Sequence, residues 1–313
     1  MSERHDITPQ PHGAGLTPEE RRGALSGAFC YVFWGLCPLF WKLLEEVDSF
    51  EIIAQRIIWC FVTVAIVCAV AKLDVRGLLR NRRAWRYLVP SALLITVNWS
   101  IYIYAVNSGN VVETAIGYYI NPLVSIVLGM IVFHERLTRL QGIAVALCVF
   151  GIVFFTVNYG RFPWIAVAFA ITFGLYGAVK KKAGYPATTA LAFESGVMLI
   201  PSIVFAVALA HITGTHAFLG DTATMHGWLI TALLVLAGPV TAVPLLLFAN
   251  AANKIPLSLL GFLQYISPTI ALFTGVFLFG EPFTLAHAVC LGSIWCGLAL
   301  VGYETVRASQ ASA

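Results

Sequence analysis

The chain of 313 residues is 59% apolar and only 11% charged, and its formal net charge is +4. Its apolar residues fall into runs of about 20, separated by short polar gaps, which is the length that a helix needs to cross the roughly 30 Å of hydrocarbon in a bilayer. Spanning backbone must satisfy its own hydrogen bonds, and the alternating polarity of barrel strands is absent, so a transmembrane barrel is excluded. The predicted fold class is an all-α polytopic membrane protein.

In chain order, ten spans are predicted between two hydrophilic tails. The first five are expected at residues 23–44, 51–71, 87–106, 111–133 and 139–157. The other five are expected at residues 162–179, 187–210, 227–249, 256–279 and 284–303. They define two predicted five-helix domains, residues 23–157 and 162–304. Residues 1–22 are expected to form a disordered cytoplasmic tail, and residues 305–313 a second cytoplasmic tail.

The Lys and Arg residues are sorted between the two sides of the membrane. With the N-terminus placed in the cytoplasm, 16 of the 19 basic residues fall at cytoplasmic ends and connections, Lys180, Lys181 and Lys182 among them. Short cytoplasmic loops carry such an excess of positive charge in membrane proteins. The sorting predicts an even number of spans with both termini in the cytoplasm.

The middle of the chain repeats near its end. A shift of 146 positions places Tyr-Ile-Asn-Pro at 119–122 over Tyr-Ile-Ser-Pro at 265–268, and Gly151 over Gly297. Each copy holds five predicted helices, and an odd number gives the second copy the opposite orientation in the membrane. Inverted repeats with interrupted helices at matching positions are typical of secondary transporters, whose binding site lies near the midplane.

Pro122 and Pro268 occupy equivalent positions in the two copies. Neither can donate a backbone hydrogen bond, so each is predicted to break its helix and to leave a free carbonyl about halfway across the membrane. In lipid, such a carbonyl needs a partner from the protein or from a water-filled cavity. The alternative is a packing kink that a neighbouring helix accommodates.

Several motifs together resemble the RarD branch of the EamA transporters, in the drug/metabolite transporter superfamily. They are FWGLCPLFWK (33–42), QRIIW (55–59), NWSIYIYAVNSG (98–109), GYYINPLVSIVLGMIVFHERL (117–137) and SPTIALFTGVFLFGE (267–281). The resemblance extends from about residue 22 to 304. It implies a permease of the bacterial inner membrane with ten helices in two inverted five-helix halves.

Charge is costly within a membrane and therefore indicates function, and two charged residues well inside predicted spans are candidates. Arg56 is a candidate anchor for a carboxylate or another acceptor group on a substrate, and the alternative is an arginine that reaches toward the interface. Glu194 is a candidate for proton coupling or for pairing with a basic group, and the alternative is a structural glutamate near the interface. Glu135, at a helix end, is expected to act as a gate or loop latch.

Polar and aromatic residues at mid-depth are predicted to line a cavity for an amphipathic molecule. The candidates are Trp34, Asn98, Tyr102, Tyr118, Tyr119, Asn121, Gln264 and Tyr265. The alternative for tryptophan and tyrosine near helix ends is the aromatic belt at each membrane interface.

No cofactor or metal is expected. The seven cysteines lie in apolar spans without metal-like spacing, His211, His216, Asp221 and His226 match no compact ligand pattern, and no phosphate-binding loop is present. The predicted function is a secondary transporter, an exporter of a small amphipathic metabolite or drug by alternating access. A passive channel or facilitator and an intramembrane enzyme are the alternatives. The expected partners are a small-molecule substrate and the lipid bilayer, without nucleic acid, and the oligomeric state stays open.

Overall fold

The computed structural model describes residues 16–107, 111–160, 162–214, 217–220, 223–279 and 283–311. Every regular element in these ranges is a helix, as predicted. The helices are α1 (Pro18–Lys42), α2 (Ser49–Val70), α3 (Arg76–Arg80), α4 (Arg82–Asn107), α5 (Val111–Phe133), α6 (Arg139–Tyr159), α7 (Trp164–Ala183), α8 (Ala187–Thr213), α9 (Met225–Lys254), α10 (Leu257–Gln264), α11 (Ile266–Phe279) and α12 (Leu285–Ala311).

Both predicted tails are partly helical, which corrects the sequence analysis. α1 begins at Pro18 because Thr17 and Glu20 form a reciprocal capping box, in which each side chain accepts a hydrogen bond from the backbone N–H of the other. Proline fits the first helical position, where its missing N–H would have had no partner. At the other end, α12 continues to Ala311. Residues 1–15 lie outside the described part of the chain.

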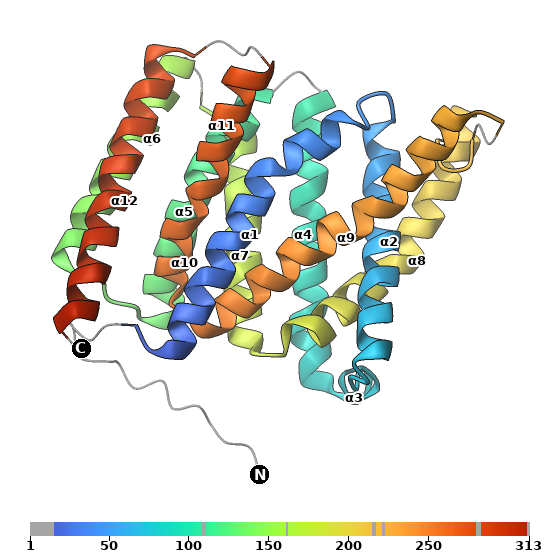
Figure 1. The fold of residues 1–313 in the computed structure, drawn as a ribbon, viewed down its shortest axis with the longest axis horizontal. Coiled ribbons are helices and arrows are strands. Elements are labelled where there is room, and N and C mark those ends of the chain that lie inside the picture. Colours follow the sequence, from blue (N-terminus) through green and yellow to red (C-terminus); the bar gives the residue numbers. More distant parts are fainter. Residues whose placement is uncertain are drawn as a thin grey trace.

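Within the described ranges, nine segments are long and apolar enough to cross a membrane. The last but one joins α10 and α11 into Leu257–Leu278. α4 is not among the nine, although it has 26 residues and was predicted as a span. It carries six arginine or tyrosine residues near its ends, and the side chains at 103, 106 and 107 lie outside the described part of the chain. The total of ten membrane spans therefore stays a prediction, although α4 runs the full height of the molecule beside α2 and α7 (Figure 1).

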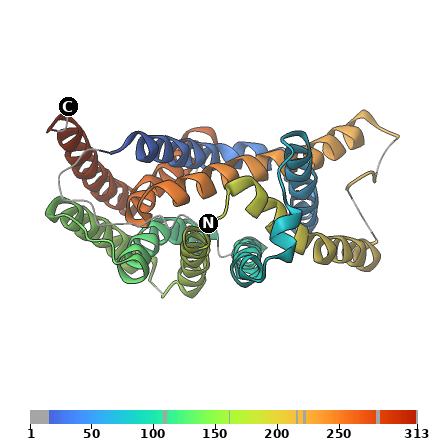
Figure 2. The same ribbon diagram turned by 90° about the horizontal axis from the view of Figure 1, so that it is seen from below.

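The helices form two layers (Figure 2). One layer contains α1, α9, α10, α11 and α12, and the other contains α4, α5, α6 and α7. α2 and α8 pack together at one end of the molecule. The two halves of the sequence therefore exchange their first helices. α1, from the first half, packs on α9 and α11 of the second half, and α7, from the second half, packs on α4 and α5 of the first.

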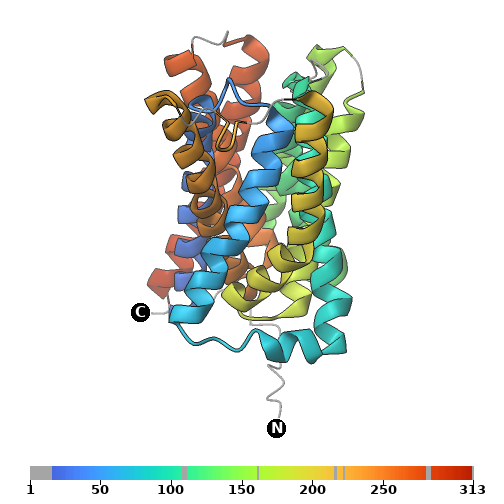
Figure 3. The ribbon, with the colours of Figure 1, turned by 90° about the vertical axis from the view of Figure 1, so that its right-hand side faces the viewer.

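α1 begins and α12 ends at the same face of the molecule, which we call the lower face (Figures 1 and 3). The upper face is the one at which α1 ends and α2 begins. Chain ends on one face require an even number of crossings.

Glycine contacts between α6 and α12 show that the halves are related by a pseudo-two-fold axis. A Cβ added to Gly151 would lie 3.0 Å from the carbonyl oxygen of Cys290, and one added to Gly297 would lie 3.0 Å from that of Ala144. Gly151 and Gly297 are 146 positions apart, and so are Ala144 and Cys290. The same spacing relates the motif copies in the sequence, so the structure joins equivalent positions of two antiparallel copies. Glycine is needed at both because the backbones approach too closely for a side chain.

The two proline motifs differ in backbone. α10 ends at Gln264 and α11 starts at Ile266, so the second helix is interrupted at Tyr265, three residues before Pro268. α5 continues through Pro122, and the predicted break there is wrong. α10 packs directly on this part of α5, where a Cβ on Gly261 would lie 2.8 Å from the carbonyl oxygen of Pro122. Close packing along α5 keeps the helix continuous in spite of one missing hydrogen bond.

Candidate functional site

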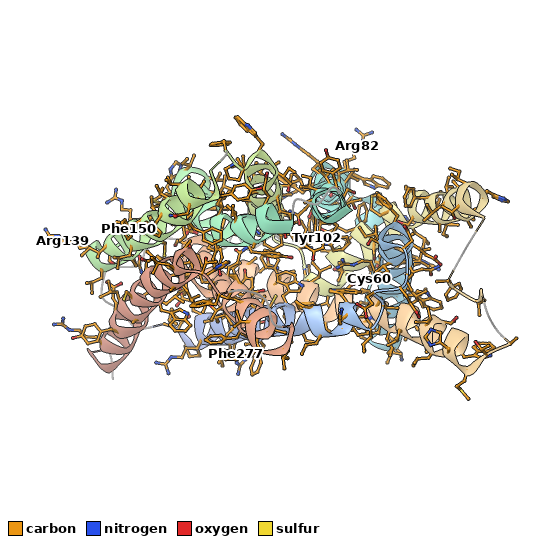
Figure 4. All side chains as sticks on the ribbon, turned by 90° about the horizontal axis from the view of Figure 1, so that it is seen from above. Cys60, Arg82, Tyr102, Arg139, Phe150 and Phe277 are labelled. Carbon is orange, nitrogen blue, oxygen red and sulfur yellow. The ribbon has the colours of Figure 1, made fainter. Side chains whose placement is uncertain are left out.

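A cavity of about 380 Å³ lies between the two layers. This is within the range of small-molecule sites, about 300 to 1,000 Å³. Helices of both halves line it, and Figure 4 shows Tyr102 near the centre of the molecule, whereas Arg82 and Arg139 lie at its edge. The lining residues are Tyr31, Trp34, Cys37, Pro38, Trp41, Lys42, Glu45, Arg56, Asn98, Trp99, Tyr102, Tyr118, Asn121, Phe169, Phe173, Val240, Gln264, Ser267 and Pro268.

The cavity extends from mid-depth to the upper face. Its lining follows α1 from Tyr31 to Lys42 and continues to Glu45, beyond the end of that helix. Below it, aromatic rings close the space: the centroid of Trp34 lies 5.6 Å from that of Phe173 and 5.9 Å from that of Phe248. Phe248 in turn stacks on Tyr176 at 5.5 Å. The protein is therefore open toward the upper face and sealed below mid-depth.

Arg56 lies in this cavity between two tryptophans. Its guanidinium carbon is 4.1 Å from the ring centroid of Trp99 and 5.0 Å from that of Trp41, within the range of cation–π contacts. Its Nε donates a hydrogen bond of 3.2 Å to Oγ1 of Thr241 on α9. No carboxylate of the described residues lies within ion-pair distance of the guanidinium. Arg56 thus faces the cavity as a cation without an anionic partner among the residues that the structure describes.

The predicted amides have different roles. Asn98 donates through Nδ2 to the carbonyl oxygen of Phe169 at 2.7 Å and to Oγ1 of Thr172 at 3.0 Å, so its amide hydrogens fasten α4 to α7. Gln264 accepts a hydrogen bond of 3.3 Å from the hydroxyl of Ser125 through Oε1. Asn121 is 2% exposed, and its Oδ1 has no hydrogen-bond partner among the described residues.

Two of the predicted lining residues lie elsewhere. Tyr119 and Tyr265, equivalent in the two copies, belong to a buried apolar cluster with Cys148, Phe155 and Cys290. This cluster packs α5 and the α10–α11 junction against α6 and α12. The neighbouring positions Tyr118 and Gln264 face the cavity instead, together with Trp34, Tyr102 and Asn121. Successive helical residues point about 100° apart, so one position in the motif decides between cavity and core.

Glu194 is not at the central cavity but in a buried ion pair with Lys180. The ammonium nitrogen lies 3.0 Å from Oε1 and 2.9 Å from Oε2, and the two side chains are only 4% and 3% exposed. Lys180 is therefore a buried residue in the last turn of α7, whereas Lys182, two positions later, is exposed. Glu194 also lines a cavity of about 30 Å³ with Cys60, Tyr176 and Trp99.

Glu135 fastens the lower face. Its carboxylate accepts hydrogen bonds of 2.7 Å from the backbone N–H of Leu257 and 2.8 Å from that of Ser258, and so caps the N-terminus of α10 from the connection between α5 and α6. Lys181 completes the contact, since its Nζ donates to the carbonyl oxygen of Ile255 at 2.5 Å and lies 3.8 Å from Glu135. The carboxylate also favours the positive end of the α10 dipole. We call Glu135, Lys181 and Ile255, with the N-terminus of α10, the lower latch.

Sequence reasoning named Trp34 but missed its neighbours on the same face of α1. Tyr31, Trp34, Pro38 and Trp41 are three or four positions apart, which places them on one helical face. That spacing is visible in the sequence and would have identified the cavity wall. Lys180 was missed because it lies directly after the predicted end of its span at residue 179.

No group of three or more metal-ligating side chains occurs among the residues described. His216 and Asp221, which the sequence analysis considered, fall outside that part of the chain, as does Glu281.

Helices of membrane-spanning length, interleaved around a cavity that opens to one face, define an integral membrane protein with an internal cavity. The comparisons with known proteins narrow this class. The model of the EamA-like transporter family matches residues 21–157 and again residues 163–303. The chain therefore belongs to the EamA-like transporter family, and its relatives place it in the RarD-type branch.

Three relatives illustrate the similarity. The chain is 39% identical over 300 residues to the uncharacterized transporter YojE of Bacillus subtilis, with 94% of this chain and 98% of the relative covered. It is 37% identical to protein RarD of Streptomyces exfoliatus (94% and 92% covered) and 35% identical to protein RarD of Escherichia coli (92% and 96% covered). A solved crystal structure shares the fold with a TM-score of 0.70 at 18% identity, covering 90% of this chain and 97% of that one.

Proposed function

We propose that the protein is a secondary transporter that exports a small amphipathic molecule by alternating access. The observation that carries the proposal is the central cavity, which is open to the upper face and closed below by the aromatic rings and the lower latch. The pseudo-symmetric halves support it, because a two-fold relation offers a matching arrangement that opens to the other face. A passive channel needs a polar path through both faces, and the apolar rings beneath Trp34 argue against one. An intramembrane enzyme needs converging acids and bases, whereas Arg56 and Glu194 line different cavities.

We further propose that the lower face is cytoplasmic and that the membrane is the bacterial inner membrane. The basic residues of α3, the start of α4 and the loop after α5 all lie at the lower ends of their helices. In this orientation the structure is the outward-open state.

For coupling, we propose that a proton would act on the Lys180–Glu194 pair rather than on a free carboxylate. Opening the pair would change the walls of the small cavity. Trp99 lines both cavities and stacks on Arg56, so it connects the pair to the central cavity.

Labelling of Cys37 tests orientation and alternating access together. Cys37 lines the central cavity, and a protein that keeps only this cysteine is expected to react with an impermeant thiol reagent added to the upper face. In the same background, cysteines at Phe162 and Leu219 should react from outside, and cysteines at Asn81 and Arg136 from the cytoplasm, because all four positions are exposed. A carrier predicts that any treatment that speeds labelling of Cys37 from one face slows it from the other. Rates that rise together from both faces would indicate a channel, and reversed labelling of the peripheral cysteines would refute the orientation.

The two prolines are expected to differ in their effect on this labelling. Pro268→Ala supplies an N–H for the carbonyl of Gln264 and should join α10 to α11, which disfavours the upper-open state by about one backbone hydrogen bond. At about 0.5–1.5 kcal/mol this is a twofold to tenfold fall in Cys37 labelling from the upper face. Pro122→Ala is the matched control, because α5 is already continuous, and should cause no such fall. Equal falls in both variants would show that the interruption at Tyr265 does not hold the cavity open.

A further inference from the structure

The charges that line the central cavity do not balance. Lys42 and Glu45, at the mouth, form an ion pair with each other. Arg56 lies deeper and has no carboxylate partner among the described residues. The lining therefore carries one uncompensated positive charge within the membrane-spanning part of the protein. A buried cation without a partner is costly, and a bound anion removes that cost.

The surroundings of Arg56 restrict where that anion binds. The rings of Trp41 and Trp99 both lie within cation–π distance of the guanidinium, and its Nε–H donates to Thr241. A guanidinium has five N–H groups in one plane, and those on the two terminal nitrogens have no acceptor among the described residues. They leave an edge that matches the two oxygens of a planar carboxylate.

A second requirement comes from buried polar atoms in the same cavity. Oδ1 of Asn121 has no donor, although the side chain is 2% exposed, and the hydroxyl of Tyr31, 1% exposed, has no partner either. Buried acceptors are normally satisfied, so an unpaired amide oxygen that lines a cavity indicates a ligand with an N–H or O–H group. Between these polar points the walls are aromatic, from Trp34, Phe169 and Phe173.

From this arrangement we infer that the substrate is an organic monoanion, with a carboxylate for Arg56, an apolar or aromatic body, and an N–H or O–H donor for Asn121. The inference rests on the proposed transport function and specifies its substrate class. The walls favour a flat apolar body, because stacking on aromatic rings and burial of apolar surface contribute together. Neutral and cationic amphipathic compounds leave the guanidinium edge unpaired and bind more weakly.

A matched set of small probes tests this inference on the full-length protein in lipid nanodiscs, with affinity measured by calorimetry. N-acetyl-L-phenylalanine has all three features, its primary carboxamide lacks the charge, and 3-phenylpropionate lacks the N–H donor. A charge-assisted bond to a carboxylate predicts that the first probe binds about tenfold to a hundredfold more tightly than its carboxamide. 3-Phenylpropionate is expected to bind a few times more weakly than N-acetyl-L-phenylalanine.

Variants assign the preference to residues. Arg56→Gln should remove the preference for the anion over the carboxamide, whereas Arg139→Gln, an exposed arginine at the edge of the molecule, should preserve it. Asn121→Val should weaken the binding of N-acetyl-L-phenylalanine and leave the affinity for 3-phenylpropionate unchanged, because only the first probe donates a hydrogen bond to Oδ1. The comparison of probes on the unaltered protein needs no variant to fold.

Equal affinity for anion and carboxamide, tighter binding of the carboxamide, or no binding of either carboxylate at millimolar concentration would overturn the inference. So would an Arg56→Gln variant that is folded and keeps the preference. The Cys37 labelling experiment does not depend on any ligand. If Cys37 labelling changes in opposite directions from the two faces but the protein shows no preference for the anion, the transport function is supported and only the inferred substrate class is wrong.

Discussion

Lys180→Met is expected to destabilise the protein by about 3–5 kcal/mol, because it leaves the buried carboxylate of Glu194 without its partner. Glu194→Gln should cause a loss of similar size, since it leaves the ammonium group buried without a counter-charge. The double variant Lys180→Met with Glu194→Leu should recover most of that stability, because an apolar pair of similar volume has no charge to bury. The measurement is the melting temperature, in the same detergent, of the unaltered protein, the two single variants and the double variant.

Lys182→Met is the matched control, because Lys182 follows two positions later on α7 and is exposed. Its melting temperature should stay close to that of the unaltered protein. Single variants as stable as the control would show that the ion pair does not form in the membrane-embedded protein. The double variant also tests the coupling proposal: with the fold preserved and the pair removed, a pH gradient should no longer change the labelling of Cys37 from either face.

Glu135→Gln is expected to open the lower latch. The carboxylate accepts two backbone hydrogen bonds from the start of α10, and hydrogen bonds to a charged group contribute about 1.5–3 kcal/mol each. The neutral amide keeps one acceptor oxygen and loses the favourable contact with the helix dipole and with Lys181. Labelling of Cys37 should therefore fall from the upper face and rise from the lower face, by about tenfold or more.

A second substitution reaches the same latch without changing a charge. Gly129 lies under the carboxylate of Glu135, and a Cβ added there would be 2.6 Å from Oε2. Gly129→Ala should therefore displace the carboxylate and reproduce the effect of Glu135→Gln. Gly142→Ala, where an added Cβ meets nothing within 4 Å, controls for the loss of a glycine. Glu304→Gln controls for the loss of a carboxylate, because Glu304 accepts one hydrogen bond from the hydroxyl of Thr138. Opening in either control as large as in Glu135→Gln would contradict the assignment of the latch.

Hydropathy predicted the all-helical fold and the depth of most residues, because the cost of placing polar groups in hydrocarbon depends on distance from the interface. The repeat spacing of 146 positions reappears in the contacts of Gly151 and Gly297. α4, predicted as a span, is not among the nine segments found in the described ranges.

The sequence did not predict which way each side chain faces around the axis of its helix. Asn121 and Tyr119 have the same depth to within one turn, yet one faces the cavity and the other the core. Pair formation was equally hidden, because Lys180 and Glu194 lie on different helices and meet only in the folded protein. Arg56 was predicted as a cavity residue because a single charge with no partner on its own helix has few other places to lie.

The interruption at Tyr265 shows that one short sequence pattern exists in two backbone shapes within one molecule. The pattern Tyr-Ile-Asn-Pro is an uninterrupted helix in α5, and Tyr-Ile-Ser-Pro separates α10 from α11. Because the copies share the proline and differ only by Asn and Ser, the choice of shape comes from the neighbours of each copy rather than from its letters. The asymmetry between the halves accompanies a cavity that opens to one face. If the two copies exchanged their backbone shapes, the pseudo-two-fold axis would give an arrangement of the same fold in which the cavity opens toward the lower face.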